Sequence, residues 1–256
     1  MTWSIERRRD ACFRASMGGV FLRPDTVIVE RPGWYQVITP TSKSANEIVF
    51  SQLGEDEADL AIENAVAAYR AHGQSTKWCV GYWTKPDDFG ERLIRHGFTS
   101  WDVRGMGCES SLVLAAPNRV SVEEVTDNNM DGYIRTLLRG WSLPPEEGDV
   151  ERRVLQAALG MQPRTEFCFV ARLDSEMVGT AALALRGDYA YLLGTQVLES
   201  ARGHGVYRAL VSARLAFLQR RGIEYAVTQA REATSAPMLE HLGFETLFRS
   251  KCYLRA

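Results

Sequence analysis

Apolar and polar positions alternate along this chain with two periods, one of two residues and one of between three and four. Short apolar runs with the first period, bounded by turn residues, predict strands, and longer stretches with the second predict helices. In the first part of the chain we expect helices at 4–16, 55–72 and 86–96, strands at 26–30, 34–39, 47–52 and 77–81, and β-rich sequence to residue 115.

The second part begins after a turn signal at Pro117 and Asn118, where we place a domain boundary. The two predicted domains are residues 1–115 and 119–256. In the second we expect a strand at 119–125, two helices between 127 and 160, strands at 166–172, 177–185 and 189–197, a helix at 205–221, a strand at 224–229, a helix at 235–241 and a final strand. This order predicts an α/β (α+β) fold with sheets flanked by helices.

One predicted helix start has the features of an anion site. The segment "ESARGHGVYRAL" (199–210) places Gly203 and Gly205 just before a helix, where glycine lets the backbone approach a ligand closely. The first amides of a helix lack intrahelical acceptors, and the helix dipole adds about half a positive charge there. Arg202 and Arg208 add cations, so we expect this end to bind phosphate. The helix has an apolar face, which we expect to pack on the sheet, made of Val206, Leu210, Ala213 and Phe217.

Two segments of the chain echo each other. "AYRAHGQSTKWCVGYWTKPDDFGERLIRHGF" (68–98) and "AFLQRRGIEYAVTQAREATSAPMLEHLGF" (216–244) share the order helix, glycine, strand, loop, short helix, Gly-Phe. A duplicated domain explains the echo, although any α/β chain repeats helix, glycine and strand. At the place of the glycine loop the first half has "VFSQLGEDEADLAI" (49–62), whose four carboxylates repel phosphate. We therefore expect only the second half to hold an anion.

Composition narrows the function. Thirty Lys and Arg against 32 Asp and Glu leave a net charge of −2, which provides no basic field for nucleic acid. We see no apolar run long enough for a membrane span, and no apolar segment follows the basic N-terminus as in a signal peptide. Five scattered cysteines without CxxC spacing indicate a reducing, cytoplasmic setting. Four dispersed histidines predict no metal site.

The loop and the closing helix together resemble one family. Residues 197–205, with Arg202 and Gly205, resemble the Arg/Gln-x-x-Gly-x-Gly/Ala loop of GCN5-related N-acetyltransferases (GNAT), although Tyr207 occupies the third motif position. "SAPMLEHLGF" (235–244) is similar to the closing helix of that family. The resemblance covers about residues 119–256, and the first half looks like a degenerate second copy, as in tandem members. It implies two GNAT-like domains, each with a central mixed, mostly antiparallel sheet flanked by helices.

The resemblance also implies an activity: acyl transfer from acyl-CoA, expected to be acetyl-CoA, directly to the amine of a small molecule or peptide. The pyrophosphate would bind the amides of 203–207, and the pantetheine would pair with the strand near Gln196. The amide of Val197 would polarise the thioester carbonyl. The implied cofactor-binding residues are Gln196, Val197, Leu198, Arg202, Gly203, His204, Gly205, Val206, Tyr207, Arg208, Ser235 and Met238.

The catalytic acid and base stay unassigned. Leu239 stands where the family often has a tyrosine that acts as the general acid. Water could protonate the leaving thiolate instead. Glu232 replaces a common asparagine and could approach the acceptor, but a solvated or structural carboxylate is the more frequent reading. We read His241 as structural. The strand at 189–197 carries three residues of one parity that could reach the pocket or serve in packing, namely Tyr189, Tyr191 and Thr195.

The first half offers aromatic residues but no recognisable catalytic group. Trp34 and Trp78 are expected in the core, and Tyr35 could lie in the core or wall an acceptor site. The loop at 81–88, with Tyr82, Trp83 and two carboxylates, suits a cationic or aromatic acceptor or simply a surface turn. Two function classes remain open: an acyltransferase, and a non-catalytic module that binds acyl-CoA or senses a ligand. The acceptor, the acyl length and the oligomeric state are left unassigned.

Overall fold

The computed structural model describes residues 3–42, 46–115 and 117–256. Its elements, in chain order, are α1 (Ile5–Arg14), β1 (Val27–Arg31), β2 (Trp34–Ile38), β3 (Glu47–Ser51), α2 (Ala58–Arg70), β4 (Thr76–Val80), α3 (Phe89–Arg95), β5 (Thr99–Glu109), β6 (Val120–Glu124), α4 (Met130–Trp141), α5 (Glu147–Gly160), β7 (Glu166–Leu173), β8 (Glu176–Arg186), β9 (Tyr189–Val197), the 3-10 turn η1 (Glu199–Ala201), α6 (Val206–Arg220), β10 (Tyr225–Arg231), α7 (Ser235–His241) and β11 (Glu245–Arg255). Every expected helix and strand is present, and η1 is an addition. Within the described residues, no helix is both long and apolar enough to cross a bilayer.

The chain forms two compact units whose segments interlace. Unit 1 contains residues 1–15, 106–228 and 239–245, and unit 2 contains residues 16–105, 229–238 and 246–256. The N-terminal helix α1 therefore belongs with the second half of the chain, and most of the C-terminal strand β11 belongs with the first. The boundary that we predicted near residue 116 falls partly on Ala116, which lies outside the described residues.

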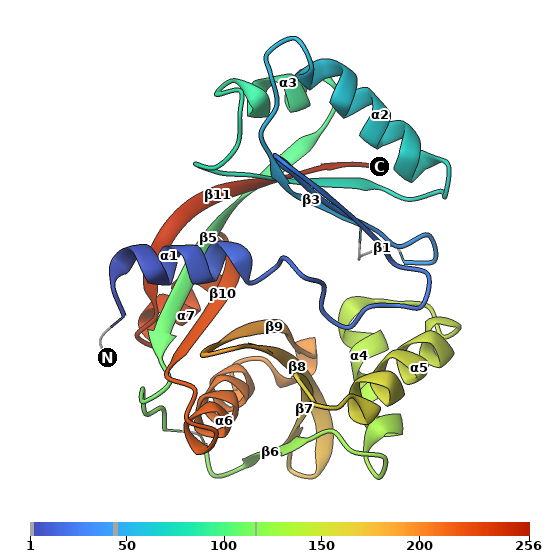
Figure 1. Cartoon of the computed structure of the whole chain (residues 1–256). Coiled ribbons are helices and arrows are strands. Elements are labelled where there is room, and N and C mark those ends of the chain that lie inside the picture. Colours follow the sequence, from blue (N-terminus) through green and yellow to red (C-terminus); the bar gives the residue numbers. More distant parts are fainter. Residues whose placement is uncertain (1–2, 43–45, 116) are drawn as a thin grey trace. The chain divides into compact units, whose positions relative to one another are not determined.

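Unit 1 is built on a sheet with the strand order β10-β9-β8-β7-β6. Strands β6 to β9 pair antiparallel in sequence, whereas β9 and β10 pair parallel. Helix α6 contacts the sheet on one face, and α4, with α5 beside it, contacts the other (Figure 1). Because both faces are covered, the middle of β8, residues 178–184, is a continuous buried run rather than an alternating one.

The apolar face of α6 carries its packing, as the sequence predicted. Val206, Leu210 and Phe217 are buried, and the Phe217 ring lies 4.7 Å from that of Phe167 and 5.3 Å from that of Phe169 on β7. Three buried aromatic rings of this kind each remove a large apolar area from water. Phe217 anchors the C-terminal part of α6 on the sheet, and the buried Val206 and Leu210 hold its N-terminal part.

Unit 2 has the strand order β1-β2-β3-β4-β11-β5, again with one parallel pair, β3 and β4, among antiparallel neighbours. Its core is aromatic: the Trp78 ring lies 5.4 Å from that of Trp34 and 4.9 Å from that of Phe89. Both tryptophans are buried, which confirms their expected core role. Each unit thus contains a parallel strand–helix–strand segment (β3-α2-β4 and β9-α6-β10), and the end of its helix and its second strand lie within the sequence echo.

Candidate functional site

Strands β9 and β10 pair only over the first part of their length. Parallel pairing runs from Tyr189 opposite Tyr225 to Tyr191 opposite Val227, and the Thr228 hydroxyl then donates to the Leu192 carbonyl at 2.8 Å. β9 continues to Val197, but residues 193–197 have no partner strand on this side in the described structure. Half of a central strand therefore offers free backbone groups to a ligand.

A β-bulge bends β9 at the point where this pairing stops. On β8 the partners Thr180 and Ala182 are two residues apart, but they face Gln196 and Leu193, which are three apart. Gly194 lies inside the bulge with φ of +60°, a conformation that glycine adopts without strain. The extra residue turns the following part of β9 away from regular pairing.

A buried arginine supports the bulge. Arg214 on α6 is 1% exposed, and its guanidinium donates to the carbonyl of Ala182 at 3.0 Å and to the hydroxyl of Thr195 at 2.8 Å. It also reaches the carbonyls of Leu193 and Leu210. All of these acceptors are neutral, and burial lowers the pKa of Arg214 to about 10. Arg214 was not among the residues expected at the site, although its spacing from Leu210 and Phe217 places it on the buried face.

Backbone geometry orients the amide of Val197 toward the open edge. The next amide, of Leu198, donates to the carbonyl of Val178 on β8 at 2.8 Å. Because successive N–H groups of a strand point to opposite sides, the Val197 N–H points away from β8. This is the direction that a donor to a ligand carbonyl at the open edge would need.

The side chain of Gln196 lies on the face of the sheet that α4 covers, and its carbonyl oxygen has no hydrogen-bond donor in the described part of the structure. The side chain is 8% exposed, and its amide nitrogen donates to the carbonyl of Thr136 at 3.1 Å and the hydroxyl of Thr180 at 3.0 Å. Its Oε1 is buried and has no partner among the described residues. A side chain at Gly140 of α4 would overlap this oxygen, so the glycine makes room for it. Buried carbonyl oxygens are normally paired, so the lack of a partner for this one is unusual.

The loop after β9 exposes amides as predicted, but its two glycines differ. Gly203 and Gly205 both have positive φ, and α6 begins at Val206. A Cβ on Gly203 would meet nothing within 4 Å, whereas one on Gly205 would overlap Pro117. The open approach that we expected at both glycines therefore exists only at Gly203, and Gly205 packs against the chain instead.

The loop has unused donors and cations. The amides of residues 203–205 have no acceptor among the described residues, and those of 206–208 form the free first turn of α6. Arg202, His204 and Arg208 are exposed, and neither arginine forms an ion pair in the described part of the chain. The ring of Tyr207, at the position where the motif has a small residue, is half-buried, and burial raises its pKa. The structure thus brings residues 196–198 and 202–208 together in unit 1.

The two remaining predicted contacts lie in α7. The Ser235 hydroxyl accepts a hydrogen bond from the Arg231 amide at 3.0 Å, and Met238 is 45% exposed. Both residues belong to unit 2, and their contact with a cofactor remains a prediction.

Glu232, the candidate base, is held by two arginines. Arg104 binds both carboxylate oxygens, one of them at 2.6 Å, and Arg249 binds at 2.7 Å. The hydrogen bonds from Arg104, together with both positive charges, lower the pKa of Glu232 to about 2. A carboxylate with this pKa is a very poor proton acceptor at neutral pH, which favours the structural reading.

The other candidates fall into packing or surface positions. Leu239 is buried, His241 is exposed at the end of α7, and Tyr189 packs edge-on to Trp3 with ring centroids 6.1 Å apart. Burial raises the pKa of Tyr189. Tyr191 and Thr195 are half-buried on β9, and Thr195 accepts from Arg214.

The side chains of the aromatic loop at 81–88 in unit 2 already contact other residues of the chain, which leaves few of them available to an acceptor. Trp83 is buried against Phe248, with ring centroids 5.3 Å apart, while Tyr82 is 62% exposed. Asp88 binds Arg92 at 2.9 Å, and Asp87 binds Lys85 at 2.6 Å. Both carboxylates are thus neutralised by the chain itself.

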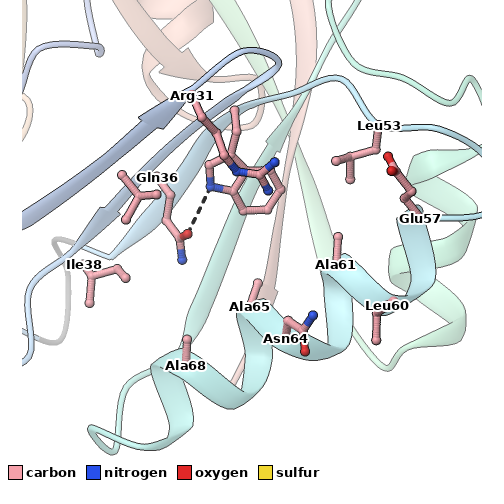
Figure 2. A pocket seen from close by; sticks show the side chains of 12 residues that line it. Arg31, Gln36, Ile38, Leu53, Glu57, Leu60, Ala61, Asn64, Ala65 and Ala68 are labelled. Atoms are coloured by element: carbon pink, nitrogen blue, oxygen red, sulfur yellow. Dashed lines mark hydrogen bonds between the residues drawn. The ribbon is translucent and has the colours of Figure 1, made fainter.

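Unit 2 also contains a pocket of about 390 Å³ between β1, β2 and α2 (Figure 2). Ala61, Ala65 and Ala68 of α2 line one side, and Arg31 and Gln36 lie on the other (Figure 2). The Trp34 indole, which also lines the pocket, donates to Gln36 at 3.1 Å. The Arg31 guanidinium lies 5.0 Å from the centre of the Trp34 ring. None of the predicted cofactor-binding residues lines this pocket.

Comparisons with known proteins point to one family. Residues 133–244, which include β9, the loop and α6, match the model of the acetyltransferase (GNAT) family. No curated protein sequence matches the chain significantly.

Solved structures share the fold over nearly the whole chain. A conserved protein of unknown function from Staphylococcus epidermidis has a TM-score of 0.70 at 13% identity and covers 93% of this chain and 98% of its own. A GCN5-related N-acetyltransferase from Kribbella flavida gives 0.62 at 14%, with 99% and 96% covered. A tandem GNAT protein from the clavulanic acid biosynthesis pathway gives 0.58 at 16%, with 98% and 94% covered. At these identities the likeness is one of fold, and it confirms the predicted fold class.

Proposed function

We propose, from the family match over residues 133–244, that this protein is an acyl-CoA-dependent N-acyltransferase that uses acetyl-CoA and an amine acceptor. The observation that carries the proposal is the unpaired half of β9, which leads directly into a loop of free amides at the start of α6. A pantetheine chain needs the first feature and a pyrophosphate the second.

Each part of the acyl-CoA donor would be bound by a different set of backbone amides and side chains. The amides of Gly203 to Tyr207, with the charges of Arg202 and Arg208, would bind the pyrophosphate. Backbone groups of residues 196–198 would pair with the pantetheine, and His204 would add a side contact. Bound acyl-CoA would supply an activated thioester, and the N–H of Val197 would donate to its carbonyl oxygen. Loss of one such donor typically costs about 3 kcal/mol in the transition state.

Proton transfer in this proposal relies on water. Glu232 is too acidic to accept a proton at neutral pH, and Leu239 has none to give. A thiol leaving group has a pKa of about 8.5, like that of free cysteine, so its thiolate can depart without a protein acid. The acceptor would deprotonate through solvent, which predicts faster transfer to amines of lower pKa.

The proposal has a direct test in CoA release. The full chain is incubated with acetyl-CoA and a panel of small amines, aminoglycosides, amino acids and peptides, and free thiol is measured. Release that depends on an acceptor supports the enzyme. Tight acyl-CoA binding without acceptor-dependent release across the panel would support the second candidate, a non-catalytic acyl-CoA-binding module, which the absence of an acid at Leu239 and of a base at Glu232 favours.

The proposal includes a cellular compartment and a second copy of the fold. All five cysteines are free and buried, which supports a reducing compartment such as the cytoplasm. The parallel β3-α2-β4 segment of unit 2, whose second strand lies within the sequence echo, supports a degenerate copy of the GNAT fold that has lost its donor site.

A further inference from the structure

Two cysteines far apart in sequence lie opposite each other in the sheet of unit 2. Cys79 on β4 is the direct antiparallel partner of Cys252 on β11, and their sulfur atoms are 3.4 Å apart. Both residues are buried, with 5% and 4% of their surface exposed. The separation exceeds a disulfide bond by only about 1.4 Å, which small side-chain rotations can close.

A carboxylate and an ammonium group, which can accept a proton and stabilise a thiolate, lie beside the cysteine pair. The Cys79 thiol donates to Oε1 of Glu47 at 2.6 Å, and the Lys77 ammonium binds the other carboxylate oxygen at 3.0 Å. The Cys79 thiol, whose one proton can go either to Glu47 or to the Cys252 sulfur, and the charge of Lys77 lower the pKa of Cys252. Cys252 is therefore suited to be the nucleophile, and Glu47 is placed to take the proton of Cys79.

The other cysteines lack such surroundings. Cys12 donates to two backbone carbonyls, and burial raises the pKa of Cys12 and Cys168 to about 12. Burial also raises the pKa of Cys108. Within the described residues, Glu47, Cys79 and Cys252 also form the one group whose ligand atoms could hold a metal ion. Against a metal stands Lys77, whose positive charge already occupies the carboxylate.

We propose that Cys79 and Cys252 are a redox-active dithiol that hydrogen peroxide oxidises to a disulfide, with Glu47 and Lys77 as positioning residues. The Cys252 thiolate attacks one peroxide oxygen and breaks the O–O bond, which forms a sulfenic acid and releases water once the departing hydroxide is protonated. Cys79, its proton passed to Glu47, attacks the sulfur of Cys252. The S–S bond forms, the S–OH bond breaks, and the hydroxide takes the proton from Glu47. Two thiols are oxidised by two electrons, and the peroxide is reduced to two molecules of water.

The bond would tie the C-terminal strand to the first half of the chain. β11 belongs to unit 2 although residues 110–244 separate it from β5, the preceding strand of that unit's sheet. A crosslink between residues 79 and 252 constrains the unfolded chain strongly because the loop it closes is long. Oxidation would therefore hold β11 in place and raise the midpoint of thermal unfolding.

Peptide mapping of the oxidised full-length protein tests this. The reduced protein is treated with one to a few equivalents of hydrogen peroxide, unfolded in an alkylating agent, digested and analysed by mass spectrometry. We expect a disulfide between the peptides that contain Cys79 and Cys252, with the other cysteines alkylated. Cys79→Ser and Cys252→Ser should each abolish the crosslink, and Cys108→Ser, which changes an isolated buried cysteine, should keep it.

A kinetic comparison tests the positioning residues. Glu47→Gln should slow disulfide closure at least about tenfold, since a general base contributes this much or more. If Glu47→Gln does not fold, as judged by circular dichroism, Lys77→Met replaces it, with slower sulfenic acid formation expected. Equal oxidation of all five cysteines, no crosslink in the folded protein, or one tightly bound zinc that protects both thiols would overturn the proposal.

Discussion

Arg214 has an unusual role for a charged residue, because its cation is fully buried among neutral acceptors. It donates to the carbonyls of Ala182 and Leu193 and to the Thr195 hydroxyl, which together form the two sides of the β9 bulge. Guanidinium suits this role, since its donors are fixed in one plane and can reach several acceptors at once. We infer that Arg214 sets the course of the strand edge that we assign to the donor.

Arg214→Met should therefore weaken both stability and donor binding. Each buried acceptor left without a donor costs about 1–3 kcal/mol, so we expect a loss of roughly 2 kcal/mol or more in the free energy of unfolding. Arg220→Met, at the exposed last turn of the same helix, is the matched control. Urea unfolding and acetyl-CoA titration measure the two effects. An unfolding free energy equal to that of the control would show that the bulge does not depend on this arginine.

Glu232 makes the acid stability of the protein depend on one carboxylate. Its pKa falls from 4.5 in the unfolded chain to about 2 in the folded one, chiefly through the Arg104 hydrogen bonds. A group with a lowered folded pKa stabilises the fold above pH 4.5, and this contribution is lost as the pH falls toward 2. Glu232→Gln should therefore show a flatter loss of stability between these pH values than the wild type, measured by urea unfolding at several pH values.

The same variant separates structure from catalysis. At pH 7 the turnover of Glu232→Gln should stay within a few-fold of wild type, whereas removal of a general base typically costs 10²–10⁴-fold. Glu63→Gln, which changes an exposed carboxylate on α2, serves as control for both measurements. A drop of a hundredfold in turnover with an unchanged fold would return Glu232 to the catalytic machinery.

At the scale of elements, the loop between β9 and α6 is the feature that the proposed function depends on most. Gly203 is the residue to change, because a side chain there meets open space, whereas one at Gly205 would overlap Pro117. Gly187, in the turn between β8 and β9, is a matched control, since it also has positive φ and a Cβ there would likewise meet no atom within 4 Å. Backbone strain from a substitution should therefore be similar at both glycines.

Gly203→Asp should abolish acyl-CoA binding, whereas Gly187→Asp should preserve it. A carboxylate a few ångströms from a phosphate costs about 4 kcal/mol at an effective dielectric of 20, which corresponds to roughly a thousandfold in affinity. Isothermal titration with acetyl-CoA measures the affinity, and thermal unfolding measures the shared strain. Equal affinity of the two variants would remove the loop from the donor site.

The elements were predictable to a large extent, and their partners much less so. Periodicity indicated the helices and strands, and the glycine motif located the loop, because both signals are local. Arg214 was missed although its spacing from Leu210 placed it on the apolar face, since an arginine in an amphipathic helix normally reaches solvent. The pair of Cys79 and Cys252 could not be foreseen from spacing, because it exists only through the pairing of β4 with β11.

At the scale of the whole molecule, the chain interlaces its two units, which a linear boundary does not describe. Unit 1 takes α1 from the N-terminus, and unit 2 takes most of β11 from the C-terminus. Sequence proximity favours pairing between neighbouring strands, but it does not determine which sheet a terminal strand joins. Fragments cut near residue 116 would lose these elements, so questions about donor stoichiometry require the intact chain.

The start of α2 in unit 2, which we propose as the counterpart of the α6 loop, is occupied by the chain's own acidic groups. Glu57 accepts a hydrogen bond from the amide of Gly54 at 3.2 Å, and Asp59 binds Arg92 at 2.7 Å and His96 at 2.9 Å. A phosphate placed there would meet these carboxylates, at a cost of several kcal/mol near a protein surface. Attraction to a helix end contributes only about 0.3–1 kcal/mol at exposed positions, so repulsion should win.

The intact protein should therefore bind one acyl-CoA per chain despite its two units. Isothermal titration of the full chain with acetyl-CoA should saturate at one equivalent, and the same titration of Gly203→Asp should show no binding, because the donor site in unit 1 then carries a carboxylate. Two equivalents for the wild type, or one remaining equivalent in the variant, would mean that unit 2 has kept a donor site and that its acidic helix start is neutralised by Arg92 strongly enough to admit a phosphate.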